Sequence, residues 1–579
     1  MKKNRKITAI LAATLLAFTT TACRAASAPS PEPTTTGGTD RITVFHATLD
    51  TLADVVSKLQ SDSTIIMSGP VTSNNISTIS NIIQNSSFAI NLDLKNVTGL
   101  DSIPNSGFKM CNRLKSIKLP DTVKSLGWDA FDLCTSLVSI EIPDSVDTIG
   151  VYAFSYCFSL TSITIPASVT TIDGALAPNC QKLTEIIVDS GNTNYVSENG
   201  VLFNKGKTTL IQCPAGKEGA YIIPSTVTEI ANSSFNGCNK LTEITIPNLV
   251  TYIGHDAFSS CTKLSEIGIP NSVVFIGNSA FSSCLELSEI VIPNSVTSLG
   301  TYAFSSCSKA TTLTISNKIT SIPSSCFSSC SSLTSVSIPN SVTSIGSSAF
   351  SSCSKLESVI IPNSVTTIGG YAFRYCSKLS EASIPDSVTT IENEAFLACD
   401  LTDVFIPKSV TTIKPLSFAC NVQTFTVDND NQYYKSIDGV LFSKDEKNLI
   451  SFPGKRTGTY SIPQGTEIID EDSFWSSKLS CVTIPDTVTT FNYGAFRYSE
   501  ELEEFIIPSS TTLFGHGILY GCTKLTSVTF NDTNGWYSTN DSISWQNKTN
   551  GTSIDVSDAA ANATYFKENL TNYWYKESN

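Results

Sequence analysis

The sequence predicts a repeat solenoid, a right-handed superhelix rich in β-strands with about 16–18 coils across residues 101–530. Two regularities carry this prediction. Cysteines recur every 23 residues, and a phenylalanine stands three residues before most of them. The cysteines in this register are Cys111, Cys134, Cys157, Cys180, Cys238, Cys261, Cys284, Cys307, Cys330, Cys353, Cys376 and Cys399.

One repeat unit, LTSVSIPNSVTSIGSSAFSSCS from Leu333 to Ser354, indicates how a coil is built. Val336 and Ile338 are alternate residues, so they point to the same side of a short strand. Pro339 cannot donate a backbone hydrogen bond and is expected to end that strand. The other inward residues of the unit are Leu333, Val342, Ile345, Ala349, Phe350 and Cys353. Stacked units bury a continuous interior, which is how a solenoid gains stability.

Two longer intervals interrupt the register, at residues 188–224 and 427–463. Each reads as strand, turn, strand and proline, which predicts a β-hairpin that leaves one coil. Two roles are open for these inserts: they lengthen or brace the solenoid, or they are binding knobs on its rim. The inserts match each other, because residues of the first recur 239 positions later as Tyr195/Tyr434, Val201/Val440, Leu202/Leu441, Phe203/Phe442, Pro214/Pro453 and Ile223/Ile462.

Residues 42–100 and 531–579 lack the register and are expected to cap the two ends of the solenoid. In the first cap, apolar spacing predicts helices near residues 52–59 and 76–83, and strands near 65–67 and 90–94, an α/β arrangement. In the second, residues 559–570 are expected to form a short helix. Its aromatic residues are expected to fold back on the last coil: Trp536, Tyr537, Trp545, Tyr573, Trp574 and Tyr575.

The first 22 residues predict a signal peptide, because a basic start precedes an apolar stretch too short to span a bilayer. Thr20-Thr21-Ala22-Cys23 resembles a bacterial lipobox, with a lipid on the sulfur of Cys23, although Thr20 stands where Leu is usual. Plain secretion is the alternative. Residues 23–41 are rich in Pro, Thr and Gly and predict an extended tether. No later stretch reaches the ~20 apolar residues of a spanning helix, so a lipid would be the only membrane anchor.

The pattern L-x-x-I-x-I-P-x-S-V-T-x-I-G-x-x-A-F-x-x-C resembles the leucine-rich repeat of BspA-like surface proteins, known from spirochaetes, oral anaerobes and trichomonads. The resemblance covers about Leu100 to Phe530. It implies a leucine-rich repeat solenoid with a strand in every coil, and adhesion as the function. Commoner leucine-rich repeats carry an asparagine ladder after the first strand. This chain has Ser295, Ser341 and Ser364 near there, so its turn must be satisfied differently.

The repeated cysteines are expected to stand in a column, because each coil returns the chain about 4.8 Å from the preceding strand. Disulfides are one interpretation, since the chain is expected to be secreted. The favoured interpretation is a ladder of buried thiols that act as small apolar side chains, because the side chains run parallel and Ser477 and Ser499 occupy the same position. No C-x-x-C pair exists, and no metal site is predicted.

Acidic residues repeat at the outward-facing third position of the unit: Glu185, Glu243, Glu266, Glu289, Glu381 and Glu504. In consecutive coils, like charges would start about 4.8 Å apart and repel. The row is either a solubilising surface or an acidic stripe on the concave face that binds a basic partner or a divalent cation. The remaining outward positions are mostly Ser and Thr, which suits proteins or glycans as partners.

The composition and the absence of catalytic motifs argue against several classes of function. A net charge of −14 argues against nucleic-acid binding. The chain has only three histidines, and His255 and His516 are expected to be exposed in variable loops. No G-x-S-x-G, H-E-x-x-H or Gly-rich phosphate loop is present, so neither an enzyme nor a cofactor is predicted.

The predicted function is protein binding at a cell surface, as adhesion to host matrix proteins, host cells or other bacteria. The expected location is the extracellular face of the cell envelope, with a lipid anchor in the outer membrane or, alternatively, after secretion. A structural surface-coat lipoprotein without a dedicated ligand is the alternative function.

Overall fold

The computed structural model describes residues 43–418 and 421–577. The predicted signal peptide, Cys23 with its lipobox, and the tether up to residue 41 lie outside the described residues. Among the described residues, no helix combines the length and the apolar character needed to cross a bilayer.

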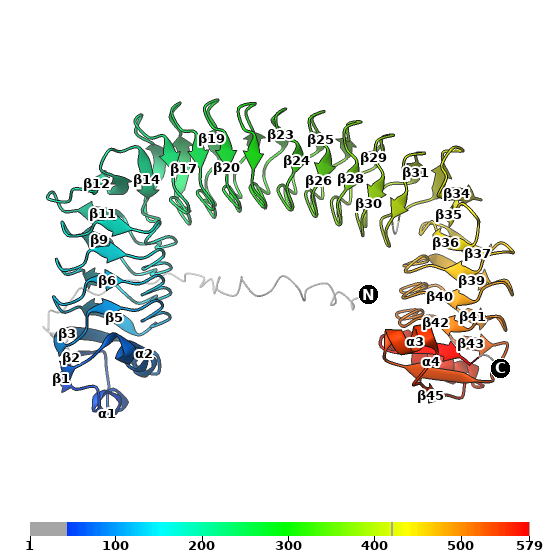
Figure 1. Ribbon diagram of the computed structural model, residues 1–579, viewed down its shortest axis with the longest axis horizontal. Coiled ribbons are helices and arrows are strands. Elements are labelled where there is room, and N and C mark those ends of the chain that lie inside the picture. Colours follow the sequence, from blue (N-terminus) through cyan, green and yellow to red (C-terminus); the bar gives the residue numbers. More distant parts are fainter. Residues whose placement is uncertain (1–42, 419–420, 578–579) are drawn as a thin grey trace, which may run out of the picture. The chain divides into compact units, whose positions relative to one another are not determined.

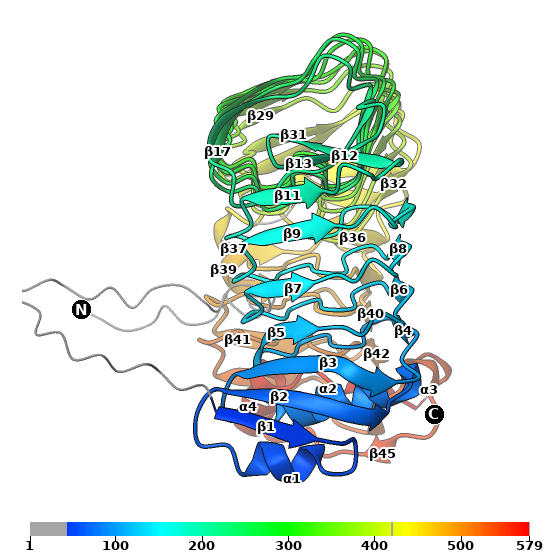
Figure 2. The same cartoon turned by 90° about the vertical axis from the view of Figure 1, so that its left-hand side faces the viewer.

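The described chain winds through successive turns that each contribute one strand to a first ladder of parallel strands (Figure 1). Figure 2 shows β5, β7, β9 and β11 side by side in this ladder. The strands of the first ladder are β1 Thr43–Ala47, β2 Ser63–Pro70, β3 Ile90–Thr98, β5 Leu114–Lys118, β7 Ser139–Glu141, β9 Ser162–Ile165, β11 Glu185–Val188, β15 Gly219–Ile222, β17 Leu241–Thr245, β19 Glu266–Gly268, β21 Glu289–Val291, β23 Thr312–Thr314, β25 Ser335–Ser337, β27 Ser358–Ile360, β29 Glu381–Ala382, β31 Asp403–Ile406, β33 Thr424–Val427, β37 Thr457–Ser461, β39 Lys478–Thr483, β41 Glu504–Ile507 and β43 Ser527–Phe530.

A second ladder of parallel strands, most of them two residues long, follows the first strand in most turns, and the inserts supply two longer strands to it. Its strands are β4 Ser102–Ile103, β6 Ser125–Leu126, β8 Thr148–Ile149, β10 Thr171–Ile172, β14 Thr209–Gln212, β16 Glu229–Ile230, β18 Tyr252–Ile253, β20 Phe275–Ile276, β22 Ser298–Leu299, β24 Ser321–Ile322, β26 Ser344–Ile345, β28 Thr367–Ile368, β30 Thr390–Ile391, β32 Thr412–Ile413, β36 Asn448–Ser451, β38 Ile468–Ile469, β40 Thr490–Phe491 and β42 Leu513–Phe514.

The predicted solenoid is confirmed, but the number of turns is about 21 rather than 16–18. The difference has a physical reason. Strands β1, β2 and β3 of the N-terminal region pair in parallel and continue into β5, so the predicted cap already contains turns of the first ladder. Each insert adds a turn as well, because it supplies β14 or β36 to the second ladder.

The repeat unit folds as its residue types require. Val336 is buried while its neighbours Ser335 and Ser337 are exposed, as strand alternation predicts. After Pro339, the amide of Val342 closes a tight turn on the proline carbonyl at 3.0 Å. Gly346 then passes so close to the preceding turn that a Cβ there would lie 2.7 Å from the carbonyl oxygen of Ile322.

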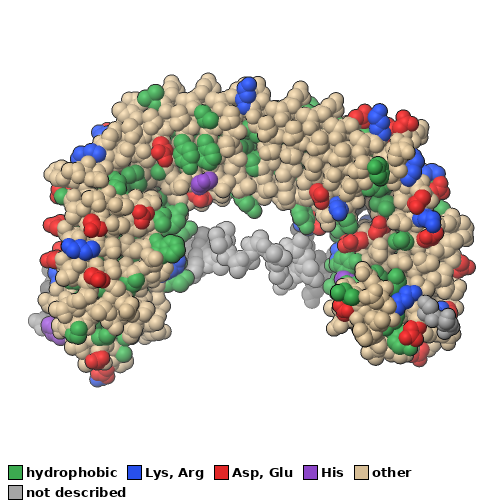
Figure 3. Space-filling view, viewed as in Figure 1, with side chains coloured by type: hydrophobic (Ala, Val, Ile, Leu, Met, Phe, Trp, Pro, Cys, Tyr) green, Lys and Arg blue, Asp and Glu red, His purple; other side chains and the backbone are tan. Residues whose placement is uncertain are grey.

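The core between the ladders contains a column of stacked phenylalanines, one in most of the regular turns. Phe281 and Phe304 have ring centroids 4.9 Å apart and planes 3° apart, and both are fully buried. Such offset stacking is repeated along the column at the strand spacing. On the face drawn in Figure 3, charged side chains are scattered, and most of the surface is neither apolar nor charged.

The caps contain the predicted helices. In the N-terminal region these are α1 Leu52–Ser57 and α2 Ile76–Gln84, with a 3-10 turn, η1, at Ser73–Asn75. The C-terminal region contains β44 Trp536–Thr539, α3 Ser542–Asn547, β45 Thr552–Ser553, α4 Ala559–Glu568 and β46 Tyr573–Lys576. Strand β46 pairs antiparallel with β42, which places Trp574 opposite Phe514, and the Trp574 ring stacks on Phe530. The aromatic tail therefore covers the last turn, as predicted.

Each insert folds as a hairpin that interrupts both ladders. The hairpins are β12 Tyr195–Glu198 with β13 Val201–Asn204, and β34 Tyr434–Ile437 with β35 Val440–Ser443. The core divides at these hairpins: Val201 and Phe203 of β13 join the central core, whereas Leu202 between them joins the N-terminal core. In β35, Leu441 joins the central core and its two neighbours join the C-terminal core. Each hairpin thus separates two hydrophobic cores and packs side chains into both of them.

The hairpins also satisfy the strand edges that they expose. The amide of Ile172, at the end of the second ladder, donates to Tyr195 Oη at 2.7 Å, and Ile413 donates to Tyr434 Oη at 2.8 Å. In the first ladder, the amide of Ile186 donates to the carbonyl of Gly200 at 2.9 Å. Unpaired edge amides would be costly. Two residues of each hairpin therefore replace a neighbouring strand, the tyrosine for the second ladder and the glycine, Gly200 or Gly439, for the first.

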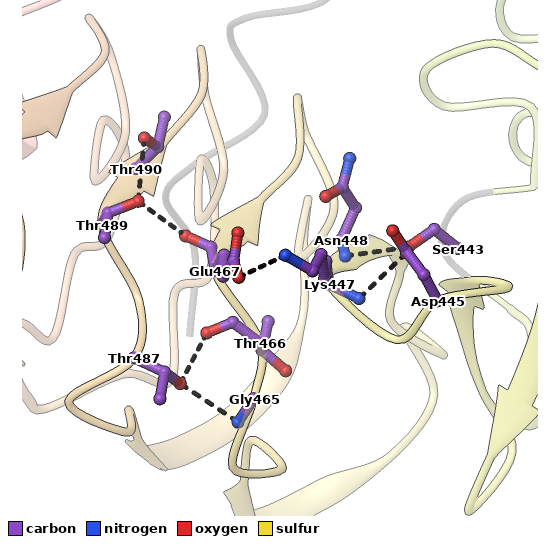
Figure 4. A network of polar contacts seen from close by, with 10 residues as sticks. All are labelled: Ser443, Asp445, Lys447, Asn448, Gly465, Thr466, Glu467, Thr487, Thr489 and Thr490. Carbon is purple, nitrogen blue, oxygen red and sulfur yellow. Dashed lines mark hydrogen bonds and ion pairs between the residues drawn. The ribbon is translucent and has the colours of Figure 1, made fainter.

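A polar network connects the turn after the second hairpin to the following coils (Figure 4). Asp445 accepts from the hydroxyl of Ser443 at 2.6 Å and from the amide of Lys447 at 3.2 Å. Lys447 Nζ in turn donates to Glu467 Oε1 at 2.7 Å, one turn further on. The insert is therefore integrated into the stack on both sides.

Candidate functional site

The outward face of the first ladder, here called the first-strand face, carries all six predicted acidic residues, and all six are exposed. Glu243 on β17 lies directly opposite Glu266 on β19, and Glu289 on β21 holds the same position one turn further on. The remaining three are separate: Glu185, Glu381 and Glu504 pair in register with Ser162, Ser358 and Ser527. The structure therefore brings three glutamates together in consecutive turns, whereas Glu381 is followed at the same position by the exposed Asp403.

A shallow hollow lies beside the first two glutamates of this row. It has a volume of about 350 Å³ and is lined by Glu243, Glu266, Thr245 and Asn248. It forms where Gly268 stands at an outward position that carries a side chain in most turns. Within the described residues, no three or more Asp, Glu, His or Cys side chains are arranged to hold a metal ion.

Exposed apolar side chains share the first-strand face, and the prediction of mostly Ser and Thr there was wrong in several turns. These residues stand two positions after the acidic one, between the two inward residues of the strand: Ile187, Ile222, Val291, Ile360, Phe405 and Ile506. Ile360 keeps 66% and Phe405 50% of its surface exposed. The signal was present in runs such as Asp403–Ile406, DVFI, where strand alternation forces the middle apolar residue outward.

The cysteine ladder is buried, and its members do more than fill space. Most of the thiols donate to the carbonyl of the phenylalanine in the preceding turn: Cys284 Sγ lies 3.3 Å from Phe258 O, and Cys307 Sγ lies 3.3 Å from Phe281 O. Cys111 and Cys238, which have no such phenylalanine in the turn before them, donate instead to the carbonyls of Ser80 and Cys213. Ser499 makes the same contact with Phe474 O at 2.9 Å, which explains why serine can replace cysteine. Burial raises the pKa of Cys284 to about 12, so this thiol stays protonated as the donor requires.

All of the cysteines predicted to form the ladder are buried. They are Cys111, Cys134, Cys157, Cys238, Cys261, Cys284, Cys307, Cys330, Cys353, Cys376 and Cys399. Cys481 is different, because it lies on β39 and is exposed.

A serine ladder takes the place of the asparagine ladder expected in commoner repeats. Ser341 Oγ donates to the carbonyl of Ile319 at 2.7 Å, and Ser364 Oγ donates to that of Val342 at 2.6 Å, each in the preceding turn. Ser295 holds the same position but has no hydrogen-bond partner among the described residues. The turn after the first strand is thus satisfied between coils by a hydroxyl rather than by an amide.

The two histidines predicted to be exposed are half-buried instead. His255 Nδ1 accepts from the amide of Asn278 at 2.8 Å, a role that Asn232 plays for His255 itself. His516 packs between Tyr493 and Tyr573, with ring centroids 4.2 and 4.5 Å away, and burial lowers its pKa. Both are therefore structural contacts in the loop stack.

Comparison with known proteins identifies the repeat. The family model for the BspA type leucine rich repeat region matches residues 81–205, 219–330, 298–425 and 448–567. No curated protein matches the chain. Among solved structures, it is similar to a leucine-rich repeat protein from Eubacterium ventriosum, with 30% identity over 59% of this chain and 91% of that one and a TM-score of 0.44.

Two further structures are similar to the chain. The pneumococcal vaccine antigen PcpA shares 28% identity over 53% of this chain and 74% of its own, with a TM-score of 0.39. A leucine rich cell surface protein from Faecalibacterium prausnitzii shares 24% identity over 58% and 82%, with a TM-score of 0.33. Because the family model matches well over half of the residues, this chain belongs to the BspA-type leucine-rich repeat family, whose repeats generally mediate protein binding.

Proposed function

We propose that this protein binds another protein at the outer surface of a cell, through the first-strand face, and that adhesion to host matrix proteins, host cells or other bacteria is the outcome. The observation that carries the proposal is the set of exposed apolar side chains on that face, alternating with Ser, Thr and Glu. Single exposed apolar residues are common, but their repetition at one position of one ladder is a property of a surface.

The chemistry of the face favours a protein partner. Its apolar residues supply area that is stabilised when water is excluded, while the hydroxyls and carboxylates around them offer hydrogen bonds and charge selectivity. Glu243 and Glu266, directly opposite each other, would favour a partner with basic side chains. Binding of this kind needs no catalytic group, so we propose no enzymatic activity and no cofactor.

The proposed location is the extracellular face of the cell envelope. A lipid on Cys23 would hold the chain there. Treatment of whole cells with protease would remove the solenoid from intact cells if this location is correct, and would leave it intact if the protein is inside.

The binding test uses the purified full chain on immobilised matrix proteins, host cells and bacteria. Saturable attachment is expected to at least one of them. A double variant, Ile360→Ser with Phe405→Ser, should weaken it by about tenfold, because central apolar contacts dominate protein interfaces. Val274→Ser is the matched control, since Val274 is 46% exposed but lies outside the first ladder. Equal effects of both variants, or no saturable attachment, would favour a surface-coat role without a dedicated ligand.

The acidic row has its own test. The triple variant Glu243→Gln, Glu266→Gln and Glu289→Gln should weaken attachment and raise the melting temperature, because it removes repulsion between neighbouring turns. If attachment to every tested partner is unchanged, the row is only a solubilising surface.

A further inference from the structure

Two loops that follow strands of the second ladder, β8 and β28, have nearly the same sequence. Tyr152 to Cys157 reads YAFSYC, and Tyr371 to Cys376 reads YAFRYC. Both loops also have the same backbone, because both tyrosines of each are left-handed, with φ of 60° and 53° in the first and 62° and 61° in the second. The two tyrosine pairs are therefore presented by the same backbone geometry, and the sequences differ at one position, Ser155 against Arg374.

In the second loop, the side chain of Arg374 packs against both tyrosine rings. The guanidinium of Arg374 lies over the ring of Tyr371 at 5.3 Å and over that of Tyr375 at 4.5 Å, within cation–π range. Its Nε lies 2.9 Å from Glu394 Oε2 in the next turn.

A third loop repeats the arrangement after the second insert. There, Arg497 lies over Tyr493 at 5.0 Å and over Tyr498 at 5.5 Å, and it faces Asp472 at 3.4 Å. An arginine between two tyrosines with a carboxylate beside it is thus a recurrent solution in these loops.

In the first loop, Ser155 stands at the position that Arg374 has in the second loop. Ser155 is small and 4% exposed, and no cation lies over Tyr152 or Tyr156 among the described residues. Tyr156 is 40% exposed, and its ring lies edge-on to that of Phe158, which is also 40% exposed, with ring centroids 6.0 Å apart. The hydroxyl of Tyr152 bonds to Ser233 Oγ at 2.9 Å across the first insert, which holds that ring in place.

The charge around this loop complements a cation. Burial, and then the negative charges of Asp132 and Asp256, raise the pKa of Tyr156, so both carboxylates act on its ring. Lys109 pairs with Asp132 at 3.0 Å and with Asp129 at 2.9 Å. Asp256 has no basic partner within ion-pair distance among the described residues.

We propose that the Tyr152–Tyr156 loop binds an arginine side chain of a partner protein, in the position that Arg374 occupies in the equivalent loop. The exposed ring of Phe158, in contact with Tyr156, supplies apolar contact beside the guanidinium, as at the centre of protein interfaces. Tyr152 and Tyr156 lie outside the strands of the first ladder, so the inference does not depend on the first-strand face.

The test uses a tetra-arginine peptide, with tetra-lysine and tetra-citrulline peptides as controls, titrated into the full chain at physiological ionic strength. The arginine peptide should bind more tightly than the lysine peptide, because guanidinium stacks on aromatic rings, and the uncharged citrulline peptide should bind least. Tyr156→Ala should weaken arginine-peptide binding by about fivefold.

Ser155→Arg should weaken it at least as much, because an internal guanidinium would then fill the tyrosine pair. The matched control is Ser282→Arg, which adds the same charge at the same loop position of a turn that has no tyrosine pair. It should leave the affinity within about twofold of wild type.

Three results would overturn the proposal. They are equal losses in Ser155→Arg and Ser282→Arg, wild-type affinity in Tyr156→Ala, and equal affinity for the arginine and lysine peptides. Tyr156→Ala keeps the test decisive if Ser155→Arg folds poorly. None of these peptide measurements reports on the first-strand face, so failure here and failure of the proposed function are separate outcomes.

Discussion

Strand edges must be paired and the core must be covered all along the solenoid. The regular turns between residues 254 and 400 meet these two requirements in one way, and the two insert junctions meet them in another. In the regular turns, each strand edge is paired by the next turn, and each core ring is covered by the next ring. At the junctions both ladders stop, and single side chains or backbone carbonyls of the hairpins replace the missing strands. Asn192 shows this most clearly: it is 1% exposed, its amide donates to the carbonyls of Pro166 and Val169, and its oxygen accepts two amides.

The second junction repeats that arrangement with Asn431, which donates to the carbonyls of Pro407 and Val410. The difference shows how far the stability of each region depends on individual residues. A regular turn is stabilised by many equivalent contacts, so each residue contributes only one contact of a repeated set. A junction depends on a few residues that have no equivalents in the turns around them.

The largest expected effect is in the regular stack. Phe281→Ala removes a fully buried ring that stacks on both Phe258 and Phe304. It should cost about 4 kcal/mol, because a large cavity is left in a tightly packed column. Hydrogen exchange should show the loss in the turns next to Phe281, since each turn contacts only its neighbours. Uniform loss of protection along the whole chain would contradict a nearest-neighbour solenoid.

At the first junction, Asn192→Ala should cost about 3 kcal/mol, because it leaves buried carbonyl and amide groups without partners. The matched control is Asn194→Ala, whose exposed side chain donates one hydrogen bond, to Thr170 O at 3.1 Å; it should cost less than about 1 kcal/mol. Chemical denaturation of the two variants tests this. Similar stabilities would show that the junction is not held by the buried asparagine.

The turn after the second junction should be sensitive to pH. Burial raises the pKa of Asp472 to about 7, against the attraction of Arg497. Between pH 4 and 7 the folded state therefore binds a proton that the unfolded state has released, so stability should fall as pH rises through this window. The fall is up to about 4 kcal/mol and is complete above pH 7.

Asp472→Asn should abolish this fall and should be more stable than wild type at pH 8 but similar to it at pH 4. The exposed Asp486 supplies the control, because Asp486→Asn should keep the wild-type pH dependence. Denaturation curves over this pH range provide the measurement. A wild-type stability that rises from pH 4 to 7 would show that the ion pair with Arg497 outweighs burial.

The smallest effect is expected in the cysteine ladder of the regular stack. Cys284→Ser should cost about 1 kcal/mol or less, because a hydroxyl can donate to Phe258 O as Ser499 donates to Phe474 O. Cys284→Val loses the donor and adds a branched side chain to a packed column, so it should cost more. Thermal denaturation ranks the two variants. The reverse ranking would mean that the column is held by apolar packing alone.

Much of this fold could be predicted from the sequence because the same local pattern of residues recurs in every repeat unit. The register of Cys and Phe, the proline after the first strand and the alternation of Val336 and Ile338 each follow from local rules, and the structure confirms them. The runs around Ile360 and Phe405 also indicate the exposed apolar residues, because strand alternation turns the middle residue of each run outward.

Other features depend on residues that are distant in the sequence. Nothing local indicates that Tyr195 pairs with an amide 23 residues earlier, or that Tyr152 reaches Ser233 across an insert. The half-buried positions of His255 and His516 were missed for the same reason, because their partners belong to other turns or to the cap.

The sequence by itself determined the solenoid, its inward and outward positions and its two inserts, because a repeated short-range pattern needs no long-range information. Only the tertiary structure decided the number of turns and the division of the core at β13 and β35. The physical reason is that periodicity defines what each turn contributes, whereas breaks in the period are resolved only when separate turns come into contact.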